Sequence, residues 1–227
     1  IYFSYKGHHF FPSLSGDNEA IVSDPKTGTQ TAINFIDPGI DIRNASTIIH
    51  LVTVGTADAE PIIRKALALG GDAAIRVNAD SHDSFYIASQ IAEVVRQSAD
   101  GYDLVLTGKE TIDYNGSSIG GMVAELLDQP YISLATKFEL AGTTATITRE
   151  IEGGEEVNEV ALPVVVSAQK GMAEARIPNM RGIMAARTKP LKVVEPKAVE
   201  VLTTVAGFGL PPAKSGVKLV AADNVEE

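Results

Sequence analysis

Apolar and polar residues follow two different periods along the middle of the chain. Residues 46–55 (STIIHLVTVG) form a nearly continuous apolar run, which is typical of a strand buried on both faces. Residues 58–69 repeat their apolar positions every three or four residues, which predicts an amphipathic helix. The same two patterns predict strands at residues 73–77, 103–107 and 131–135 and helices at residues 83–97 and 117–127. This alternation with short connections indicates parallel βαβ units.

The pattern changes after residue 136. Three segments of strand character are separated by glycine-containing turns, which predicts an antiparallel meander over residues 137–140, 144–151 and 157–161. A buried strand at residues 164–168 and a short helix at residues 182–187 follow. The chain after Pro196 predicts an arm that either needs a partner surface or stays mobile. We therefore expect an α/β fold, with an open, mostly parallel sheet flanked by helices, an antiparallel strand extension and a C-terminal arm.

Composition narrows the classes of function. The 227 residues have 44% hydrophobic and 21% charged residues, an ordinary globular balance. The absence of cysteine excludes a disulfide scaffold, a thiolate metal site and a cysteine nucleophile. The formal net charge of -10 argues against nucleic-acid binding. No apolar run approaches the roughly 18 residues that a membrane span needs.

The first 45 residues differ from the rest. Residues 1–11 hold five of the 13 aromatic residues and show no period, so we expect a tail, or a truncated or misread start. They lack the features of a signal peptide. His8 and His9 offer a metal site as the alternative, which we disfavour because no further ligand accompanies them. We divide the chain into an atypical segment (residues 1–45), an α/β domain (residues 46–195) and the arm (residues 196–227).

Two loops are candidates for a ligand site, because parallel sheets bind ligands beyond the carboxyl ends of their strands. One includes Val54 and Gly55, and the other is the Gly- and Ser-rich stretch 107–121. In the second loop, we expect Ser117 or Ser118 to cap the helix, and this helix start suits a phosphate. Neither loop is a Walker A or GxGxxG motif. Nucleotide binding and a simple capped helix after a long turn are therefore equally compatible with the pattern.

The remaining residues of the second loop add detail to the nucleotide interpretation. Asp113 and Asn115 are placed to bond a ribose or a base edge. Lys109 either approaches a phosphate or lies on the surface. Backbone N–H groups at the small residues can come close to a ligand. These residues favour a bound nucleotide but do not identify it.

Candidates for acid–base catalysis are weak. His50 lies inside an apolar strand, which favours a structural histidine over a general base. His82 lies in a polar loop, where we expect it to be solvated. An acidic cluster around a turn is more typical of a solvated surface than of a metal or glycosidase site, and consists of Glu152, Glu155, Glu156 and Glu159. We therefore assign no catalytic residue and no metal ligand.

A basic, methionine-containing stretch follows the last predicted strand of the sheet. Between residues 176 and 197 there are six basic residues and one acidic residue, in a chain of negative net charge. Three of the four methionines, Met172, Met180 and Met184, lie in or next to it. Pliable methionine side chains beside cations suit a docking surface for partners. The equally supported alternative is that Met180, Ile183 and Met184 cover the core.

Four ordered segments between about residue 52 and residue 196 stand out, namely EPIIRKALALGGDAAIRV, YDLVLTGKETIDYNGSSIGGMVAELLDQPYIS, ITREIEGGEEVNEVALPVVVS and EARIPNMRGIMAARTKPLKVV. Through these segments the chain resembles the beta subunit of electron-transfer flavoprotein. The third matches the family signature at Arg149, Glu152, Gly153, Gly154, Glu156, Pro163, Val165, Val166 and Ser167. It departs at Asn158, where the family usually has an aliphatic residue. No site residue before residue 46 is implied.

The resemblance implies a Rossmann-like sheet of the adenine-nucleotide alpha-hydrolase type and a heterodimer with an alpha subunit. The pair shares an FAD, bound chiefly by the alpha subunit, and the beta subunit holds AMP, or a second FAD in the electron-bifurcating branch. The implied cofactor-binding residues are Val54, Gly55, Gly108, Lys109, Thr111, Asp113, Asn115, Gly116, Ser117, Ser118 and Ile119. Ser117, Ser118 and Ile119 replace a frequent Asn-Gln-Thr, and Tyr114 replaces a frequent acid.

Residues 170–190 resemble the family's recognition loop, which docks electron donors. Met180 takes the place of the usual leucine anchor, and the implied partner-docking residues are Ile177, Met180, Arg181, Ile183 and Met184. The implied function is an electron carrier rather than an enzyme. The implied donors are acyl-CoA dehydrogenases or other flavin dehydrogenases, and the acceptor is a quinone oxidoreductase.

Two other functions remain open from the sequence. One is a bifurcating subunit with a second FAD, and the other is a stand-alone adenine-nucleotide sensor like the universal stress proteins. The latter shares the α/β fold but does not require the recognition loop. The sequence favours a cytoplasmic bacterial location over the mitochondrial matrix.

Overall fold

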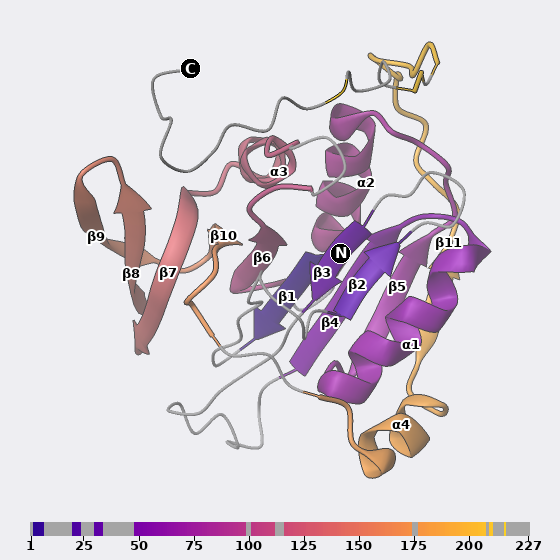
Figure 1. Cartoon of the computed structure of the whole chain (residues 1–227). Coiled ribbons are helices and arrows are strands. Elements are labelled where there is room, and N and C mark those ends of the chain that lie inside the picture. Colours follow the sequence, from indigo (N-terminus) through magenta and orange to yellow (C-terminus); the bar gives the residue numbers. More distant parts are fainter. Residues whose placement is uncertain are drawn as a thin grey trace.

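The computed structural model describes residues 2–6, 20–23, 30–33, 48–98, 101–111, 116–173, 177–207, 209–210 and 216. Its centre is a nine-stranded sheet (Figure 1). In spatial order the strands are β11 (Leu191–Val194), β5 (Ala73–Val77), β4 (Ile48–Val54), β1 (Tyr2–Lys6), β6 (Leu104–Gly108), β10 (Val164–Ala168), β7 (Tyr131–Ala141), β8 (Thr144–Ile151) and β9 (Gly154–Ala161). A separate two-stranded sheet joins β2 (Ala20–Ser23) to β3 (Gln30–Ile33).

Most strands of the large sheet run in one direction. The parallel pairs are β11 with β5, β5 with β4, β6 with β10, and β10 with β7. Strand β1 is antiparallel to both of its neighbours, β4 and β6. The fold is therefore the α/β architecture expected from the sequence, with one reversed strand in its middle. No element was predicted for Tyr2–Lys6, and His8 and His9 lie outside the described residues.

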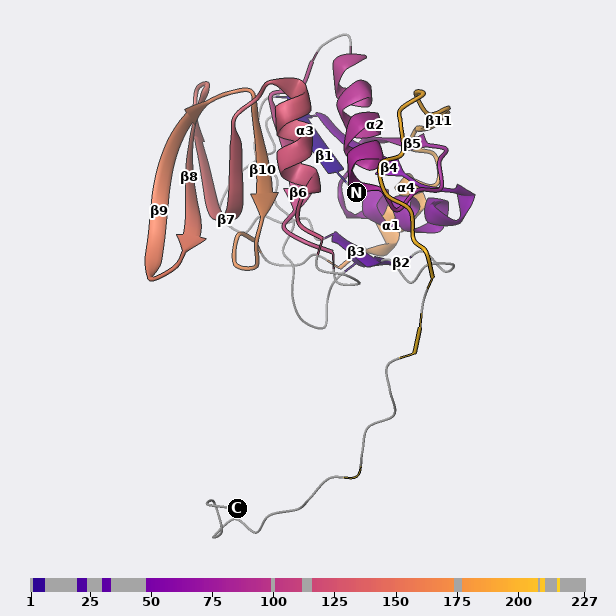
Figure 2. The same cartoon turned by 90° about the horizontal axis from the view of Figure 1, so that it is seen from above.

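Helices cover both faces of the sheet. Helix α1 (Glu60–Leu69), preceded by the 3-10 turn η1 (Ala57–Ala59), packs on one face, and α2 (Ser84–Arg96) and α3 (Ile119–Leu127) pack on the other (Figure 2). Successive side chains of β6 point to opposite faces of the sheet, so this strand contributes to the hydrophobic core on each face. Leu104 and Leu106 belong to the cluster around α1, and Val105 belongs to the cluster around α2 and α3. This two-sided burial is why the parallel strands are continuous apolar runs.

The helix ends explain the element boundaries. Helix α2 begins after Asp83, whose carboxylate accepts the backbone N–H groups of Phe85 and Tyr86 at 2.7 and 3.2 Å. Helix α3 begins after Ser118, but the Ser118 side chain makes no capping hydrogen bond. The prediction that Ser117 or Ser118 caps this helix is therefore wrong for Ser118. It is also wrong for Ser117, because the residue at the N-cap position is Ser118.

The antiparallel extension follows the predicted meander with two differences, one of which is that β9 begins at Gly154, three residues before its predicted start. Strands β7, β8 and β9 pair in order, as expected. The two separate strands predicted at residues 131–135 and 137–140 are one strand, β7, which continues through a register shift between Ala135 and Lys137. At the tip, the Arg149 guanidinium lies 2.9 Å from the Glu156 carboxylate. The acidic cluster thus lies on an exposed hairpin.

The chain after the sheet forms two further elements. Helix α4 (Met180–Ala186) packs against α1, and β11 pairs with β5 at the sheet edge. Helix α4 begins two residues before the helix predicted at residues 182–187, and β11 was not predicted. Only four residues long, β11 carries a lysine and shows no clear alternation, so its strand character comes from the free edge of β5.

The first part of the C-terminal arm lies on α2. The buried Gln90 side chain accepts the Lys197 backbone N–H at 2.8 Å and donates to the Lys197 carbonyl at 2.9 Å. Asp83 accepts the backbone N–H groups of Leu202 and Thr203, the latter at 2.7 Å. Of the two alternatives for the arm, a partner surface or mobility, the structure thus supplies a surface within the same chain as far as Thr203.

Candidate functional site

The two candidate loops meet at one edge of the sheet. Strands β4 and β6 are both antiparallel to β1, so their carboxyl ends, at Val54 and Gly108, lie on the same side. From β4 the sheet continues through β5 in one direction, and from β6 it continues through β10 in the other. Such a switch point in an α/β sheet is where ligands bind. The topology therefore brings the sequence-predicted loops together.

A buried arginine holds the first loop. Arg76 is 4% exposed and donates from Nη1 to the Gly55 carbonyl at 2.9 Å and to the Asn78 side chain at 2.8 Å. Its Nη2 atom lies 3.2 Å from Glu60 Oε1 at the start of α1. The Gly55 N–H donates to the Val77 carbonyl at 3.0 Å. Arg76 therefore fixes the turn after β4 against both β5 and α1.

Sequence reasoning missed Arg76. It interrupts the apolar strand AAIRV, and that interruption is the signal that was available. A fully buried guanidinium must be paired and hydrogen-bonded, since an unpaired buried charge is costly. Its register partner on β4 is Thr53, directly before the predicted contacts Val54 and Gly55. Its position next to the turn is what links it to the site.

The second loop is closed by its own backbone. The Thr111 N–H donates to the Gly116 carbonyl at 2.9 Å, and the Gly116 N–H donates to Thr111 Oγ1 at 3.3 Å. Lys109 Nζ lies 3.1 Å from Glu110 Oε1. Asp113 and Asn115 lie outside the described residues. Thr111 therefore shapes the loop, and Lys109 forms an ion pair near its beginning.

The start of α3 is brought close to the sheet. A Cβ atom on Gly120 would stand 2.7 Å from Thr107 Oγ1 and 2.9 Å from Tyr131 Oη, so only glycine fits. Ser117 and Ser118 are exposed and precede Ile119, the first helical residue. Their hydroxyl groups and the N–H groups of the first turn of α3 can donate hydrogen bonds to an anion. This part of the site has the chemistry of a phosphate cradle.

The histidine candidate lies away from these loops. His50 is near the amino end of β4, and its Nδ1 lies 2.8 Å from Tyr102 Oη. Partial burial lowers the pKa of His50, although Asp72 opposes the shift. Burial likewise raises the pKa of Tyr102, with a Ser98 hydrogen bond opposing it. The pair braces β4 against the loop before β6, at the opposite end of β4 from Val54.

The described residues offer neither a metal centre nor a membrane helix. Within them, no three or more histidine, aspartate or glutamate side chains gather as a metal ion would require. None of the helices drawn in Figure 1 combines the length and apolarity needed to cross a bilayer.

The predicted docking residues project from α4 and the segment before it. Ile177 is 76% exposed, Met180 73% and Met184 54%, and Arg181 and Ile183 are also exposed. The alternative that Met180, Ile183 and Met184 cover the core is therefore wrong. Of the three methionines in or next to the basic stretch, Met172 is the one that belongs to a buried core cluster. Asn179 begins α4 by accepting the Gly182 N–H at 2.8 Å.

Comparison with known proteins agrees with this architecture. The family model described as "Electron transfer flavoprotein domain" matches residues 31–199, and this match begins within the atypical segment of residues 1–45. Electron transfer flavoprotein subunit beta of Syntrophomonas wolfei is 39% identical over 173 residues, covering 75% of this chain and 68% of the relative. The Bacillus subtilis protein of the same name is 36% identical over 191 residues, covering 79% and 73%.

The similarity extends to eukaryotic proteins. The human electron transfer flavoprotein subunit beta is 32% identical over 182 residues, covering 77% of this chain and 71% of the relative. The region that the family model matches contains both loops at the carboxyl edge of the sheet and the segment that forms α4. This chain therefore belongs to the electron transfer flavoprotein family and, within it, to the beta subunits.

Proposed function

We propose that this chain pairs with an alpha subunit, holds AMP at the carboxyl edge of its sheet and docks electron donors through α4. The observation that carries the proposal is the meeting of the two loops beside the start of α3. Membership of the beta-subunit family supports the alpha partner and the association with a flavin. A bound flavin supplies the redox chemistry, and the protein supplies binding, position and electrostatics.

The residues at the loops fit a nucleotide phosphate. Ser117 and Ser118 are exposed at the positive end of the α3 dipole. Gly120 lets this helix start approach Thr107 at the end of β6. Both terminal nitrogens of Arg76 are already engaged, Nη1 with the Gly55 carbonyl and Nη2 with the Glu60 carboxylate. We therefore assign Arg76 to holding the loop and not to binding the ligand. We assign the phosphate to Ser117, Ser118 and the first N–H groups of α3.

The docking part of the proposal rests on exposure. Ile177, Met180 and Met184 are exposed apolar side chains on a chain segment rich in basic residues. Several large apolar side chains exposed along one segment are typical of protein interfaces. Electron-donating flavin dehydrogenases are the partners that suit a carrier subunit. A quinone oxidoreductase is the proposed acceptor of the assembled complex.

A charge placed at the helix start tests the nucleotide site. Ser118→Asp should weaken AMP binding to the AMP-depleted heterodimer at least tenfold, because the carboxylate repels the phosphate. Aspartate is a good N-cap residue, so α3 should remain folded. Ser118→Ala is the matched control and should change the affinity by a few-fold at most. Equal AMP affinity for Ser118→Asp and the wild type, measured by titration calorimetry, would place the phosphate elsewhere.

A further inference from the structure

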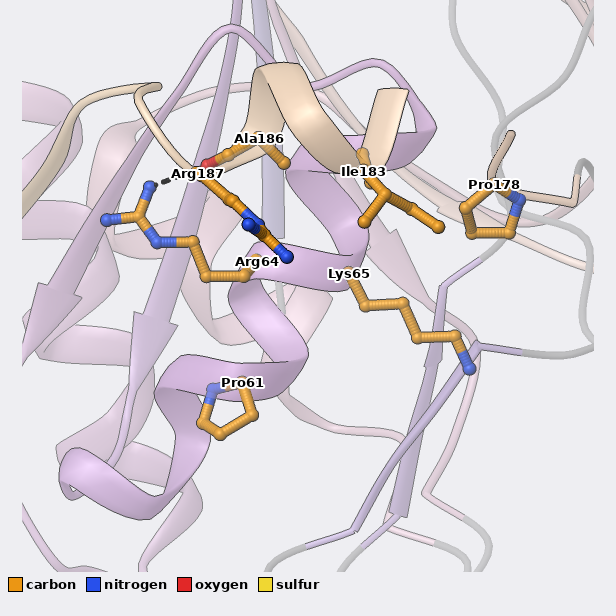
Figure 3. Close-up of a pocket in the computed structure, with 8 residues that line it drawn as sticks. Pro61, Arg64, Lys65, Pro178, Ile183, Ala186 and Arg187 are labelled. Carbon is orange, nitrogen blue, oxygen red and sulfur yellow. Dashed lines mark hydrogen bonds between the residues drawn. The ribbon is translucent and has the colours of Figure 1, made fainter. Parts of the chain in front are cut away.

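A cavity of about 650 Å³ lies between α1 and α4 (Figure 3). Helix α1 supplies one side and the chain around α4 supplies the other. The lining residues are Pro61, Arg64, Lys65, Ala68, Pro178, Ile183, Ala186 and Arg187. None of them belongs to the nucleotide loops, so the cavity is a separate feature of the molecule.

The two helices are fastened together around this cavity. Arg64 Nη1 on α1 donates to the Ala186 carbonyl at 2.9 Å and to the Lys189 carbonyl at 2.6 Å, and Figure 3 shows the first of these bonds. In return, Lys189 Nζ donates to the Leu67 and Gly71 carbonyls at the end of α1, at 2.9 and 2.6 Å. These reciprocal bonds give the cavity a defined shape.

The lining combines apolar walls with positive charge. The prolines, alanines and Ile183 supply the apolar surface. Arg64 is committed to backbone carbonyls, whereas Lys65 and Arg187 are exposed. An occupant that matches this lining has an apolar side chain to fill the cavity and acidic groups beside it to meet the two exposed cations.

The cavity adjoins the proposed docking residues of α4. Ile183 lines the cavity and is 39% exposed on α4, the helix that also presents Met180 and Met184. Met180 precedes Ile183 by three residues on this helix, so a partner seated on Met180 comes next to the cavity. The basic stretch between residues 176 and 197 favours an acidic partner over a basic one.

We propose that this cavity receives an acidic, apolar surface segment of the electron donor. Docking is then reciprocal, because the chain offers Met180 to the donor and takes a donor side chain between α1 and α4. Acidic residues that flank this side chain pair with Lys65 and with Arg187. This inference rests on the proposed donor-docking function and adds the chemistry of the donor's contact segment.

Electron transfer from a donor tests the proposal. The heterodimer containing FAD is mixed with an acyl-CoA dehydrogenase that reduces the wild-type complex, and the second-order rate of flavin reduction is measured. Lys65→Glu should lower this rate about tenfold at low salt, and the loss should shrink as salt rises. Lys192→Glu, an exposed charge reversal on β11 outside the cavity, is the matched control and should lower it much less.

A second variant tests the cavity itself. Ala68→Leu adds three carbons to the lining without changing charge and should slow the reaction at all salt concentrations. If Lys65→Glu and Lys192→Glu slow the reaction equally and Ala68→Leu has no effect, the cavity does not receive the donor. The proposal would also be overturned if the wild-type complex retained a small acidic molecule that the variants lack, while the variants were reduced at the wild-type rate. In both cases slow reduction of Met180→Ala would leave donor docking by α4 intact.

Discussion

Gly182 and Ala68 bring α4 and α1 into backbone contact, since a Cβ atom on residue 182 would overlap the Ala68 carbonyl oxygen. Alanine is normally the better helix former, by about 0.5–1 kcal/mol. We expect Gly182→Ala to be destabilising instead and to lower the free energy of unfolding by about 1–3 kcal/mol, because the backbone of α4 or α1 must move to make room for the methyl group. Urea denaturation measures the change.

Gly154→Ala is the control for this substitution. No atom lies within 4 Å of a Cβ at residue 154, and its φ is not positive. Its stability should therefore change by no more than about 0.5 kcal/mol. A Gly182→Ala protein as stable as the wild type would mean that α4 can leave α1 without cost.

Arg76 should matter to both stability and nucleotide binding. Arg76→Leu leaves the Gly55 carbonyl and the Glu60 carboxylate without their donor. Because Glu60 is partly exposed and can be solvated, we expect a loss of about 1–3 kcal/mol. The loosened turn should also weaken AMP binding several-fold in titration calorimetry. Unchanged AMP affinity in a folded Arg76→Leu protein would contradict a role for this turn in the site.

Asp83 predicts a specific dependence of stability on pH. Burial alone would raise the pKa of Asp83, but backbone N–H groups of Thr203, Tyr86, Leu202 and Phe85 lower it below its usual value. A carboxylate with a lowered pKa stabilises the fold above the pKa of an unfolded aspartate, about 3.9. That stabilisation is lost as the pH falls through the lower pKa of the folded state.

Asp83→Asn isolates this contribution. We expect a loss of about 1–3 kcal/mol at pH 7, because one amide replaces a carboxylate that accepts four N–H groups. The difference from the wild type should shrink below about pH 4. Asp80→Asn, at an exposed position, should show neither effect. A loss that is the same at pH 3 and pH 7 would rule out the carboxylate as its cause.

Met180 tests donor docking without disturbing the nucleotide. Met180→Ala should slow flavin reduction by a donor about tenfold and leave the flavin content unchanged, because the side chain is exposed. Val157→Ala removes a similarly exposed apolar side chain on β9 and should have little effect. Loss of flavin from the Met180→Ala complex would show instead that Met180 has a structural role.

The strands that the sequence predicted well have a clear apolar pattern of their own. Strands β5 and β10 have the predicted bounds because their apolar residues follow one another, and β8 has them because apolar and polar residues alternate at its start. Strands β1 and β11 were not predicted, since one has no period and the other is four residues long. Their places depend on free hydrogen-bonding edges of strands far away in the sequence, which a local pattern does not record.

The residues of the candidate site likewise fall into those that could be predicted from the local sequence and those that could not. The loops that include Gly55 and Ser118 could be predicted because they follow buried strands or begin a helix. Arg76 reaches the site only through the pairing of β5 with β4. The contact between Gly182 and Ala68 joins residues far apart in the chain, so the cavity between α1 and α4 could not be predicted from either segment alone.

The nucleotide content of the purified complex tests the central claim most directly. The chain is co-expressed with its alpha subunit, and the nucleotides released by heat are identified and counted by chromatography. We predict one FAD and one AMP per heterodimer. Two FAD and no AMP would contradict the AMP site in favour of a bifurcating subunit, and failure to co-purify with the alpha subunit would contradict the heterodimer itself.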